Sequence, residues 1–561
     1  MAFIVKKKIH GKEYYYLNEN KRIEGKVKTK TIAYLGKVKK DAEKKAGEII
    51  KKMQREKEMK REDGNKKEEN KLEQKNISIE ELTNFCKKKG FVFRSSDIYG
   101  GLAGFWDFGP LGVELFNNIK NEWWNYFVRN NENMVGIDAS IISHPRIWKA
   151  SGHITGFKDV AVICEKCKKT AKVELNEFGK VKCACGGEYE KIGVFDMLFK
   201  TSVGALDKED AYLRGETAQA MFTDFKLIQQ TSRMQLPFGI AQIGRCFRNE
   251  IAPRDFLFRL REFHIGEFEF FIHPEKEKCN LLTKEHLNLK LKLLDSETQE
   301  KGKEGLKETT IGKMLKENKL NEWHAYWLAE QIFWFYSLGL VEIKIREHMD
   351  NERAFYSSAT FDIDYEYPFG SKEVAGIANR GQYDLTQHEK ESGGSLKIFD
   401  EENGKNILPC VIEPTFGMER VFLAILTKAY LKNKKGETVL CLHPKLAPVK
   451  AAVFPIVKKP EFEKIAENIV DDLKKEWNIV YDKSGSIGRR YARNDEIGTP
   501  YCITIDGDSL KNKDVTIRER DTTKQIRVKI SELKNILRKL INQEIKFKKA
   551  GKLVNPKKKF V

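Results

Sequence analysis

The sequence predicts an α+β protein built from several domains, and three observations lead to this fold class. The chain has 561 residues, which is more than a single hydrophobic core usually organises. Two apolar-flanked segments within residues 245–269, joined by an arginine-bearing loop, are typical of an antiparallel strand pair. After residue 436, strand-like and helical segments alternate, which indicates a compact α/β domain with a mixed sheet.

Charge and apolar patterning narrow the kind of protein. The formal net charge is +20, and because Lys and Arg release counterions from phosphates, this excess favours a nucleic-acid partner over a small acidic substrate. A soluble basic protein without such a partner has the same composition. Residues 1–8 lack a signal-peptide core, and no uncharged apolar run is long enough to cross a bilayer. Six of the ten cysteines are scattered singly, which argues against a disulfide framework. Together with the lack of a signal peptide and of a membrane-spanning run, this leads us to expect a cytoplasmic protein.

The first 76 residues form a basic N-terminal extension. Residues 12–17 and 26–35 are β-like, and the segment 18–25 between them predicts a hairpin with a long turn. A lysine- and glutamate-rich stretch from residue 39 indicates a charged helix or a tether. A basic hairpin with tyrosines can hold RNA through phosphate contacts and base stacking. A small β module without a ligand would have the same sequence pattern.

The main body begins with a helix from residue 77, followed by a glycine- and aromatic-rich segment at 96–112. Glycines beside bulky rings indicate close backbone packing, and an amphipathic helix is expected over 113–127. The expected domains after the extension are 77–435, 436–545 and a basic tail at 546–561, with a helical insert at about 275–321. Whether this insert touches a nucleic acid or only covers the surface is left open by the sequence.

Four cysteines have the spacing of a candidate metal site, within an insert at 161–190. Cys164 and Cys167 are separated by two residues, as in a zinc knuckle, whereas Cys183 and Cys185 are separated by only one. Four thiolates leave no open coordination position, so a bound Zn²⁺ would be structural. A metal-free remnant with small buried cysteines is the alternative.

Candidate phosphate-binding residues are concentrated in two segments. Residues 245–269 contain Arg248, Asn249 and Glu250, and a guanidinium group suits phosphate because it stays charged and donates paired hydrogen bonds to phosphate oxygens. Residues 413–420 end on an arginine and precede an apolar helix. Neither segment contains a phosphate-binding glycine loop of the Walker or dinucleotide type.

These two segments resemble motifs two and three of class II aminoacyl-tRNA synthetases, and the segment around Pro110 with its helix resembles motif one. The resemblance covers residues 77 to about 540. It implies an antiparallel sheet flanked by helices, a homodimer with the motif-one region at its interface, and attachment of glycine to tRNA(Gly) through a glycyl-adenylate, with ATP and Mg²⁺. The strings similar to the glycyl-tRNA synthetase family are 96–112, 150–153, 213–219, 346–348 and 383–388.

The resemblance implies roles for single residues on the nucleotide side. Arg248 would hold the α-phosphate and the carboxylate of the attacking amino acid, and Arg420 would bind the γ-phosphate. Glu250 would face the adenine amino group, and Phe263 would stack on the ring. In-line displacement needs charge stabilisation and alignment more than a proton-transferring base, so we expect no general base. The expected ATP-binding set is Arg248, Asn249, Glu250, Arg261, Phe263, Glu373, Val374, Gly417 and Arg420.

The same resemblance assigns three glutamates, Glu216, Glu267 and Glu413, to the ammonium group of the amino acid. Thr415 stands where the family has serine, and its extra methyl would tighten the exclusion of side chains. Gly417 completes the expected glycine-binding set. Because glycine is the smallest amino acid, overlap alone excludes its competitors and no editing site is needed.

Residues 448–540 resemble the anticodon-binding domain shared by glycine, threonine, proline and histidine synthetases. Arg489, Arg490 and Tyr491 would read unpaired anticodon bases through stacking and guanidinium planes, and the basic tail would contact phosphates. Two other functions are weighed against this one: a class II synthetase for threonine, serine or alanine, and an inactive synthetase-derived subunit that binds nucleic acid. The three glutamates disfavour the first, and the retained nucleotide arginines disfavour the second.

Overall fold

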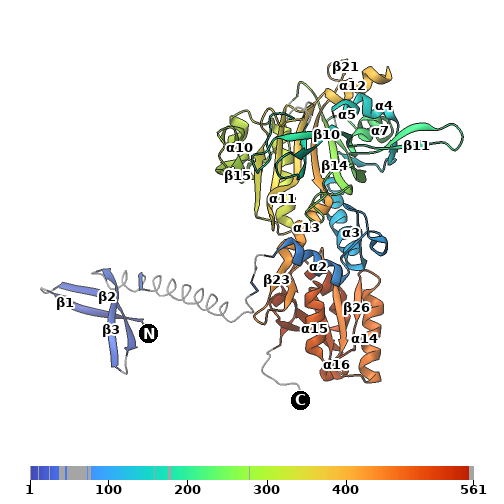
Figure 1. Cartoon of the computed structure of the whole chain (residues 1–561). Coiled ribbons are helices and arrows are strands. Elements are labelled where there is room, and N and C mark those ends of the chain that lie inside the picture. The colour runs from blue at the N-terminus through green and yellow to red at the C-terminus, as the bar shows by residue number, and fades with distance from the viewer. Residues whose placement is uncertain are drawn as a thin grey trace. The chain divides into compact units, whose positions relative to one another are not determined.

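A computed structural model describes most of the chain in two compact units, Met1–Lys71 and Leu72–Val561 (Figure 1). The described residues are 2–9, 12–23, 26–36, 45–46, 72–73, 77–156, 158–174, 178–276, 278–354 and 356–554. The lysine- and glutamate-rich stretch from residue 39 lies almost entirely outside them, as do residues 555–561 of the predicted basic tail. Residues 546–554 are described, and Phe547 and Ala550 pack into the hydrophobic cluster of the C-terminal domain, which corrects the predicted start of the tail. None of the described helices is long and apolar enough to span a bilayer.

The N-terminal unit is a three-stranded antiparallel sheet, β1 (Ala2–Ile9), β2 (Lys12–Ile23) and β3 (Lys26–Gly36), in that order. The predicted long turn over 18–25 is wrong, because β2 continues to Ile23 and pairs that residue with Lys26. Tyr15 and Leu17, two residues apart on one face of β2, are buried with Leu35 and Ala46. The unit therefore has a small hydrophobic core of its own.

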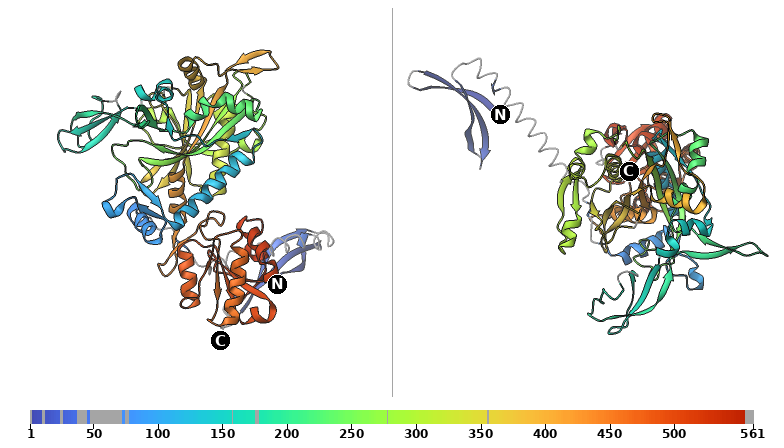
Figure 2. Two further views of the ribbon diagram at one scale, coloured as in Figure 1. Left: turned by 90° about the vertical axis from the view of Figure 1, so that its right-hand side faces the viewer. Right: turned by 90° about the horizontal axis from the view of Figure 1, so that it is seen from above.

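The second unit is built on a nine-stranded sheet in the order β16-β15-β17-β18-β19-β22-β14-β13-β6 (Figures 1 and 2). The six central strands, from β17 to β13 in this order, are each antiparallel to their neighbours. On one side β15 pairs in parallel with β17, and on the other β6 pairs in parallel with β13. The bounds are β6 (Met134–Gly136), β13 (Phe238–Phe247), β14 (Glu262–Ile272), β15 (Lys290–Leu294), β16 (Lys307–Thr310), β17 (Ile343–Glu347), β18 (Ala359–Tyr367), β19 (Gly370–Gly381) and β22 (Cys410–Gly417).

Helices α3 (Pro110–Trp124), α11 (Glu322–Ser337) and α13 (Met418–Ala429) contribute to one hydrophobic core with this sheet. Its rings interlock around Phe416, which lies 5.9 Å from the centroid of Trp123 and 5.2 Å from that of Trp334. On β14 the same core takes up Phe268 and Phe270, so the alternating residues Glu267 and Glu269 face the opposite side of the sheet. The alternation along β14 thus places its phenylalanines in the hydrophobic core and its glutamates on the other face of the sheet.

The glycine- and aromatic-rich segment packs as closely as its sequence suggests. A Cβ on Gly112 would lie 1.8 Å from the carbonyl oxygen of Phe91, and one on Gly109 would lie 2.5 Å from that of Gly90. Only glycine permits this approach at the start of α3.

The insert at 275–321 is not helical throughout, which corrects the prediction. Between the short helices α8 (Lys284–Leu287), α9 (Ser296–Glu300) and α10 (Ile311–Lys316) it contributes β15 and β16, which extend the large sheet. In β15, Leu291 and Leu293 are buried in the main core, whereas the lysines that alternate with them are exposed. This is the pattern of a strand with one face on the core and the other in solvent.

The C-terminal domain has a mixed six-stranded sheet, as predicted. Strand β25 (Ala451–Pro455) pairs in parallel with β26 (Ile479–Tyr481) and β27 (Tyr501–Ile505), and antiparallel strands follow on the far side. Towards the main domain, the side chain of Asn118 donates to the carbonyls of Leu446 and Ala447, both at 3.1 Å. The other elements are α14 (Pro460–Leu473), α15 (Ile487–Glu496), α16 (Gly507–Asn512), β28 (Asp514–Glu519), β29 (Gln525–Lys529), α17 (Ile530–Ile541), η4 (Phe547–Lys549) and β30 (Lys552–Leu553).

Shorter elements complete the main domain. They are α2 (Ile79–Lys89), β4 (Val92–Arg94), η2 (Asp97–Tyr99), β5 (Trp106–Phe108), η3 (Asn125–Arg129), β7 (Ile142–Ser143), α4 (Pro145–Ala150), α5 (His153–Gly156), β8 (Lys158–Cys164), β9 (Thr170–Glu174), β10 (Tyr189–Asp196), β11 (Phe199–Val203), β12 (Glu209–Leu213), α6 (Ala218–Thr223), α7 (Phe225–Ser232), α12 (Tyr383–Ser392), β20 (Ile398–Asp400), β21 (Lys405–Ile407), β23 (Tyr430–Lys432) and β24 (Thr438–Leu440).

Candidate active site

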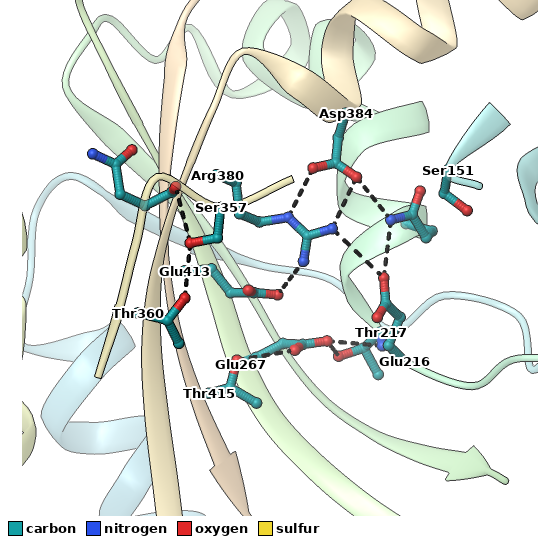
Figure 3. A network of polar contacts seen from close by, with 12 residues as sticks. Ser151, Glu216, Thr217, Glu267, Ser357, Thr360, Arg380, Asp384, Glu413 and Thr415 are labelled. Carbon is teal, nitrogen blue, oxygen red and sulfur yellow. Dashed lines mark hydrogen bonds and ion pairs between the residues drawn. The ribbon is translucent and has the colours of Figure 1, made fainter. Parts of the chain in front are cut away.

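The candidate amino-acid site lies where β14, β22 and β19 run side by side. Cross-strand pairing sets Glu267 opposite Thr415 and Ala378 opposite Glu413, so side chains distant in sequence come together (Figure 3). Glu216, just before α6, completes the set. The three predicted glutamates are thus all buried in one region.

Arg380, at the end of β19, organises this region although sequence reasoning did not select it. Its guanidinium group donates two hydrogen bonds to Asp384, at 2.7 and 2.9 Å, and one to Glu413 at 2.7 Å (Figure 3). It also lies 3.9 Å from Glu216 and stacks 3.9 Å from the ring centroid of Tyr356. Since Arg380 is buried, its charge acts on these carboxylates with little screening by water.

Glu216 is fully engaged by its neighbours. One oxygen accepts a hydrogen bond from the side chain of Gln219 at 2.9 Å, and the other lies 3.2 Å from Nε2 of His153. Burial alone would raise the pKa of Glu216, but His153 and Arg380 hold it below its ordinary value. Glu216 is therefore an ionised carboxylate, and its negative charge stabilises the buried charge of Arg380.

Glu267 accepts hydrogen bonds from the backbone N–H of Thr217, at 2.8 Å, and from the Thr217 hydroxyl. The hydroxyl of Thr415 lies 3.4 Å from its second oxygen. Burial and the charge of Glu216 raise the pKa of Glu267. Thr415 thus contacts the carboxylate that the resemblance assigns to the amino group.

A further carboxyl group, Glu269, joins the site. One oxygen each of Glu267, Glu269 and Glu413 lie within 4.8 Å of one another, and we call these three residues the carboxylate cluster. Burial raises the pKa of Glu413 to about 8, and it raises that of Glu269 well above the ordinary value. The carboxyl groups of the cluster are therefore too crowded for all of them to be ionised, and the cluster retains a proton near neutral pH.

On the nucleotide side, Arg248 follows β13 and its guanidinium group lies 5.4 Å from the ring centroid of Phe263. Nε of Arg261 donates to the carbonyl of Glu250 at 2.9 Å, which fixes the loop that joins β13 and β14. Oε2 of Glu250 is buried and has no hydrogen-bond partner among the described residues. Asn249 donates its backbone N–H to the carbonyl of Met197 at 2.8 Å.

Arg420 and Glu373 form an ion pair with an N–O distance of 2.9 Å. Although burial raises it, the charge of Arg420 holds the pKa of Glu373 below its ordinary value. A Cβ on Gly417 would lie 3.0 Å from Cδ of Arg420, so glycine at this position leaves room for the arginine side chain. Val374 corrects one expectation: its side chain is buried in the core, so only its backbone is available to a nucleotide.

Three residues of the site carried weak sequence signals. Asp384 lies in a string noted for its family resemblance, but it was not assigned a role, and Arg380, its partner four residues earlier, resembles an ordinary strand residue. Glu269 follows Glu267 by two residues, which is the spacing that puts two side chains on one face of a strand. That spacing is the signal that could have identified it.

The four cysteines of the predicted metal site converge between the ends of β8 and β10. Sγ of Cys164 lies 3.4 Å from that of Cys185, Sγ of Cys167 lies 3.6 Å from that of Cys183, and all four are within 4.8 Å of one another. A tetrahedral ion with bonds of about 2.3 Å would set the sulfurs about 3.8 Å apart. The donor set fits zinc in spite of the short second pair, and Gly187 is needed because its Cβ would lie 2.6 Å from Sγ of Cys164.

The predicted anticodon-reading residues differ in exposure. Arg489 is exposed at the start of α15. Arg490 is buried and donates to the carbonyls of Pro455 and Gly485, so its assignment as a base-reading residue is corrected to a structural one. The hydroxyl of Tyr491 lies 2.7 Å from that of Thr504.

Comparisons with known proteins agree with this geometry. Residues 450–540 match the family model "Anticodon binding domain", and residues 4–66 match "IS1634 family transposase, N-terminal domain". A solved prolyl-tRNA synthetase from Cryptosporidium parvum superposes with a TM-score of 0.51 at 15% identity, over 85% of this chain and 77% of its own, which establishes the likeness of fold.

Curated relatives match at much higher identity. The "Glycine--tRNA ligase" of Borrelia hermsii is 39% identical over 476 residues, which are 82% of this chain and 97% of the relative. That of Clostridium beijerinckii is 40% identical over 499 residues, 82% of this chain and 98% of the relative. With nearly the whole length of each relative matched, and the polar residues of the site brought together on the sheet, the chain belongs to the glycine–tRNA ligase family.

Proposed function

We propose that this protein attaches glycine to tRNA(Gly) in two steps. In the first, a carboxylate oxygen of glycine attacks the α-phosphorus of ATP, the bond to the β-phosphate oxygen breaks, and glycyl-adenylate and pyrophosphate are formed. In the second, a terminal ribose hydroxyl of the tRNA attacks the glycyl carbonyl and AMP leaves. The observation that carries this function is the group of buried carboxylates on β14 and β22. Of the nucleotide arginines, Arg248 follows the neighbouring strand β13, and Arg420 lies in α13, which directly follows β22.

Charge stabilisation would accomplish the first step without a general base. Arg248 would hold the α-phosphate and the attacking carboxylate, and Arg420 the γ-phosphate. Glu373, ionised beside Arg420, would sit near the Mg²⁺ of the nucleotide, since carboxylate oxygens suit that ion. The unpaired buried oxygen of Glu250 suits the amino group of adenine, a hydrogen-bond donor.

Amino-acid selection would depend on Glu216, Glu267 and Glu413 for the ammonium group and on steric exclusion for larger substrates. The methyl group of Thr415, beside Glu267, would occupy space that a substrate side chain needs. A site that excludes by overlap discriminates well, because every competitor is larger than glycine.

The test is amino-acid-dependent exchange of pyrophosphate into ATP by the purified protein. We expect exchange with glycine and at least about 100-fold slower exchange with alanine or serine at equal concentration, since the excluded methyl cannot be accommodated. Equal exchange with alanine or serine would reject glycine as the substrate, and no exchange with any amino acid would reject the activation step itself.

We propose that a second copy of the chain covers the motif-one region and makes the active form a homodimer. Large apolar side chains are exposed there, with 88% of Ile98, 87% of Tyr99 and 62% of Leu102 accessible. Sedimentation velocity should give twice the chain mass of 65.0 kDa. A single species of one chain mass at micromolar concentration would contradict the dimer.

Two further features belong to the same proposal. The cysteine quartet would hold a structural Zn²⁺, and Arg489 would contact the anticodon of the tRNA. All ten cysteines are free thiols, which is consistent with the reducing cytoplasm, where we place the protein.

A further inference from the structure

Glu269 is a buried carboxyl group that nothing described around it satisfies. Its side chain has no accessible surface, and neither carboxyl oxygen has a hydrogen-bond partner among the described residues. Buried carboxyl groups are normally paired, because an isolated charge away from water costs several kcal/mol. The missing partner is therefore a property of the site to be explained.

The charged groups facing Glu269 come from four elements, and they are mostly acidic. They are Glu267 on the same strand, Glu413 on β22, Arg380 on β19 and Asp384 on α12. Among these groups Arg380 is the cation, and it already donates to Asp384 and Glu413. Among the residues that the structure describes, no further cation is paired with the carboxylate cluster, and its oxygens are close enough together to share one.

We propose that Glu269 binds the ammonium group of the amino-acid substrate directly, together with Glu267 and Glu413. An ammonium group has three N–H donors, and the cluster presents three carboxyl groups around one point. Glu216, whose two oxygens are engaged by His153 and Gln219, would add its negative charge to the same pocket. This inference rests on the proposed function and names one more specificity-determining residue in the same site.

A divalent metal ion is the other cation that three carboxylates could take. The guanidinium group of Arg380, 2.7 Å from an oxygen of Glu413, would repel a doubly charged ion more strongly than a singly charged ammonium. The cluster thus favours the ammonium group.

Binding of the ammonium group would release a proton from the carboxylate cluster. In the free enzyme the crowded cluster keeps a proton on a carboxyl group, since burial and like charges raise the pKa of Glu269 and Glu413. When the ammonium group enters, that carboxyl O–H bond breaks and its proton leaves to the solvent, while the substrate keeps its three N–H bonds. The KM for glycine should therefore fall as the pH rises.

The experiment compares wild type, Glu269→Gln and the control Asp295→Asn in pyrophosphate exchange. Asp295 is a buried carboxylate in the insert at the other end of the sheet. We expect Glu269→Gln to raise the KM for glycine at least tenfold, because an ionic hydrogen bond is replaced by an amide contact, with the KM for ATP changed less than twofold. Asp295→Asn should change neither. An unchanged KM for glycine in Glu269→Gln overturns the inference.

Two measurements keep the test decisive. The wild-type KM for glycine should fall by about tenfold per pH unit between pH 6.5 and 7.5, and a flat profile overturns the inference even if the variant does not fold. Stoichiometric Mn²⁺ bound to wild type without ATP and lost in Glu269→Gln would assign the cluster to a metal ion and also overturn it. Failure of the proposed function looks different, because wild type would then show no glycine-dependent exchange at all.

Discussion

At the scale of single residues, Arg420 illustrates how the site uses a partly buried charge. It pairs with Glu373 and lies 4.4 Å from the ring centroid of Phe258. Replacement by alanine removes the charge that would stabilise the triphosphate and leaves Glu373 unpaired. We expect Arg420→Ala to lower kcat/KM for ATP in the exchange assay by about 10²–10³-fold. Lys428→Ala, which removes a partly exposed cation paired with Glu342 from the same helix, should change it less than twofold.

Arg489 and Arg490 are neighbours with separable roles. Arg490→Ala should lower the free energy of unfolding of the C-terminal domain by more than about 2 kcal/mol, because it removes charged donors from buried carbonyl groups. Arg489→Ala should leave the Tm unchanged and raise the KM for tRNA. Thermal denaturation and charging kinetics on both variants check this, and a reversed pattern would contradict the assignment.

Glu413 makes stability depend on pH. Burial raises its pKa from 4.5 to about 8, so the folded protein binds this proton more tightly than the unfolded chain. The resulting stability is complete below about pH 4 and is lost as the pH rises towards 8. We expect the Tm of the unliganded protein to fall between pH 6 and pH 8, and Glu413→Gln to reduce that fall. An identical slope in both proteins would show that another group titrates.

The residues of the site that could be predicted were those inside recognisable strings, such as Arg248 and Glu267. The role of Arg380 could not be predicted, because its partners Glu413 and Asp384 come next to it only in the folded protein. The burial of Arg490 was missed for a similar reason, since its partners are backbone carbonyls that carry no sequence signal.

At the scale of elements, we expect the three-stranded insert of β8, β9 and β10 to depend on its cysteines. Among the described residues of the insert, few are in its hydrophobic cluster, which includes Val160 and Val162, so a metal would supply much of its stability. We expect about one zinc per chain by elemental analysis, lost in Cys185→Ser and kept in Cys410→Ser, which alters a cysteine outside the quartet. Zinc retained in Cys185→Ser would rule out the four-cysteine site.

The antiparallel pair within residues 245–269 and the apolar helix after 413–420 were predictable from local patterns, whereas the pairing of strands distant in sequence was not. The prediction ended the strand at Leu17, where polar residues follow. Strand β2 instead continues to Ile23, because these polar residues pair with β3. The insert at 275–321 was predicted to be helical. Its two short strands are recruited by the edge of a sheet that lies far away in sequence.

At the scale of the whole molecule, 82% of this chain matches 97% or more of the length of its relatives, so we expect glycine activation not to need the N-terminal unit. Residues 1–76 carry a net charge of +11, more than half of the total. We expect deletion of residues 1–71 to leave glycine-dependent exchange unchanged and to raise the KM for tRNA, with a weaker dependence on salt. Identical charging kinetics across a salt series would contradict an RNA-binding role.

We propose that one site activates glycine and delivers it to tRNA. This can be measured as transfer of radiolabelled glycine to a tRNA(Gly) transcript by the purified protein in the presence of ATP and Mg²⁺. We expect label on the 3′ end of the transcript with wild type, and almost none with Arg248→Ala or with radiolabelled alanine in place of glycine. Charging that survives Arg248→Ala, or equal charging with alanine, would contradict it.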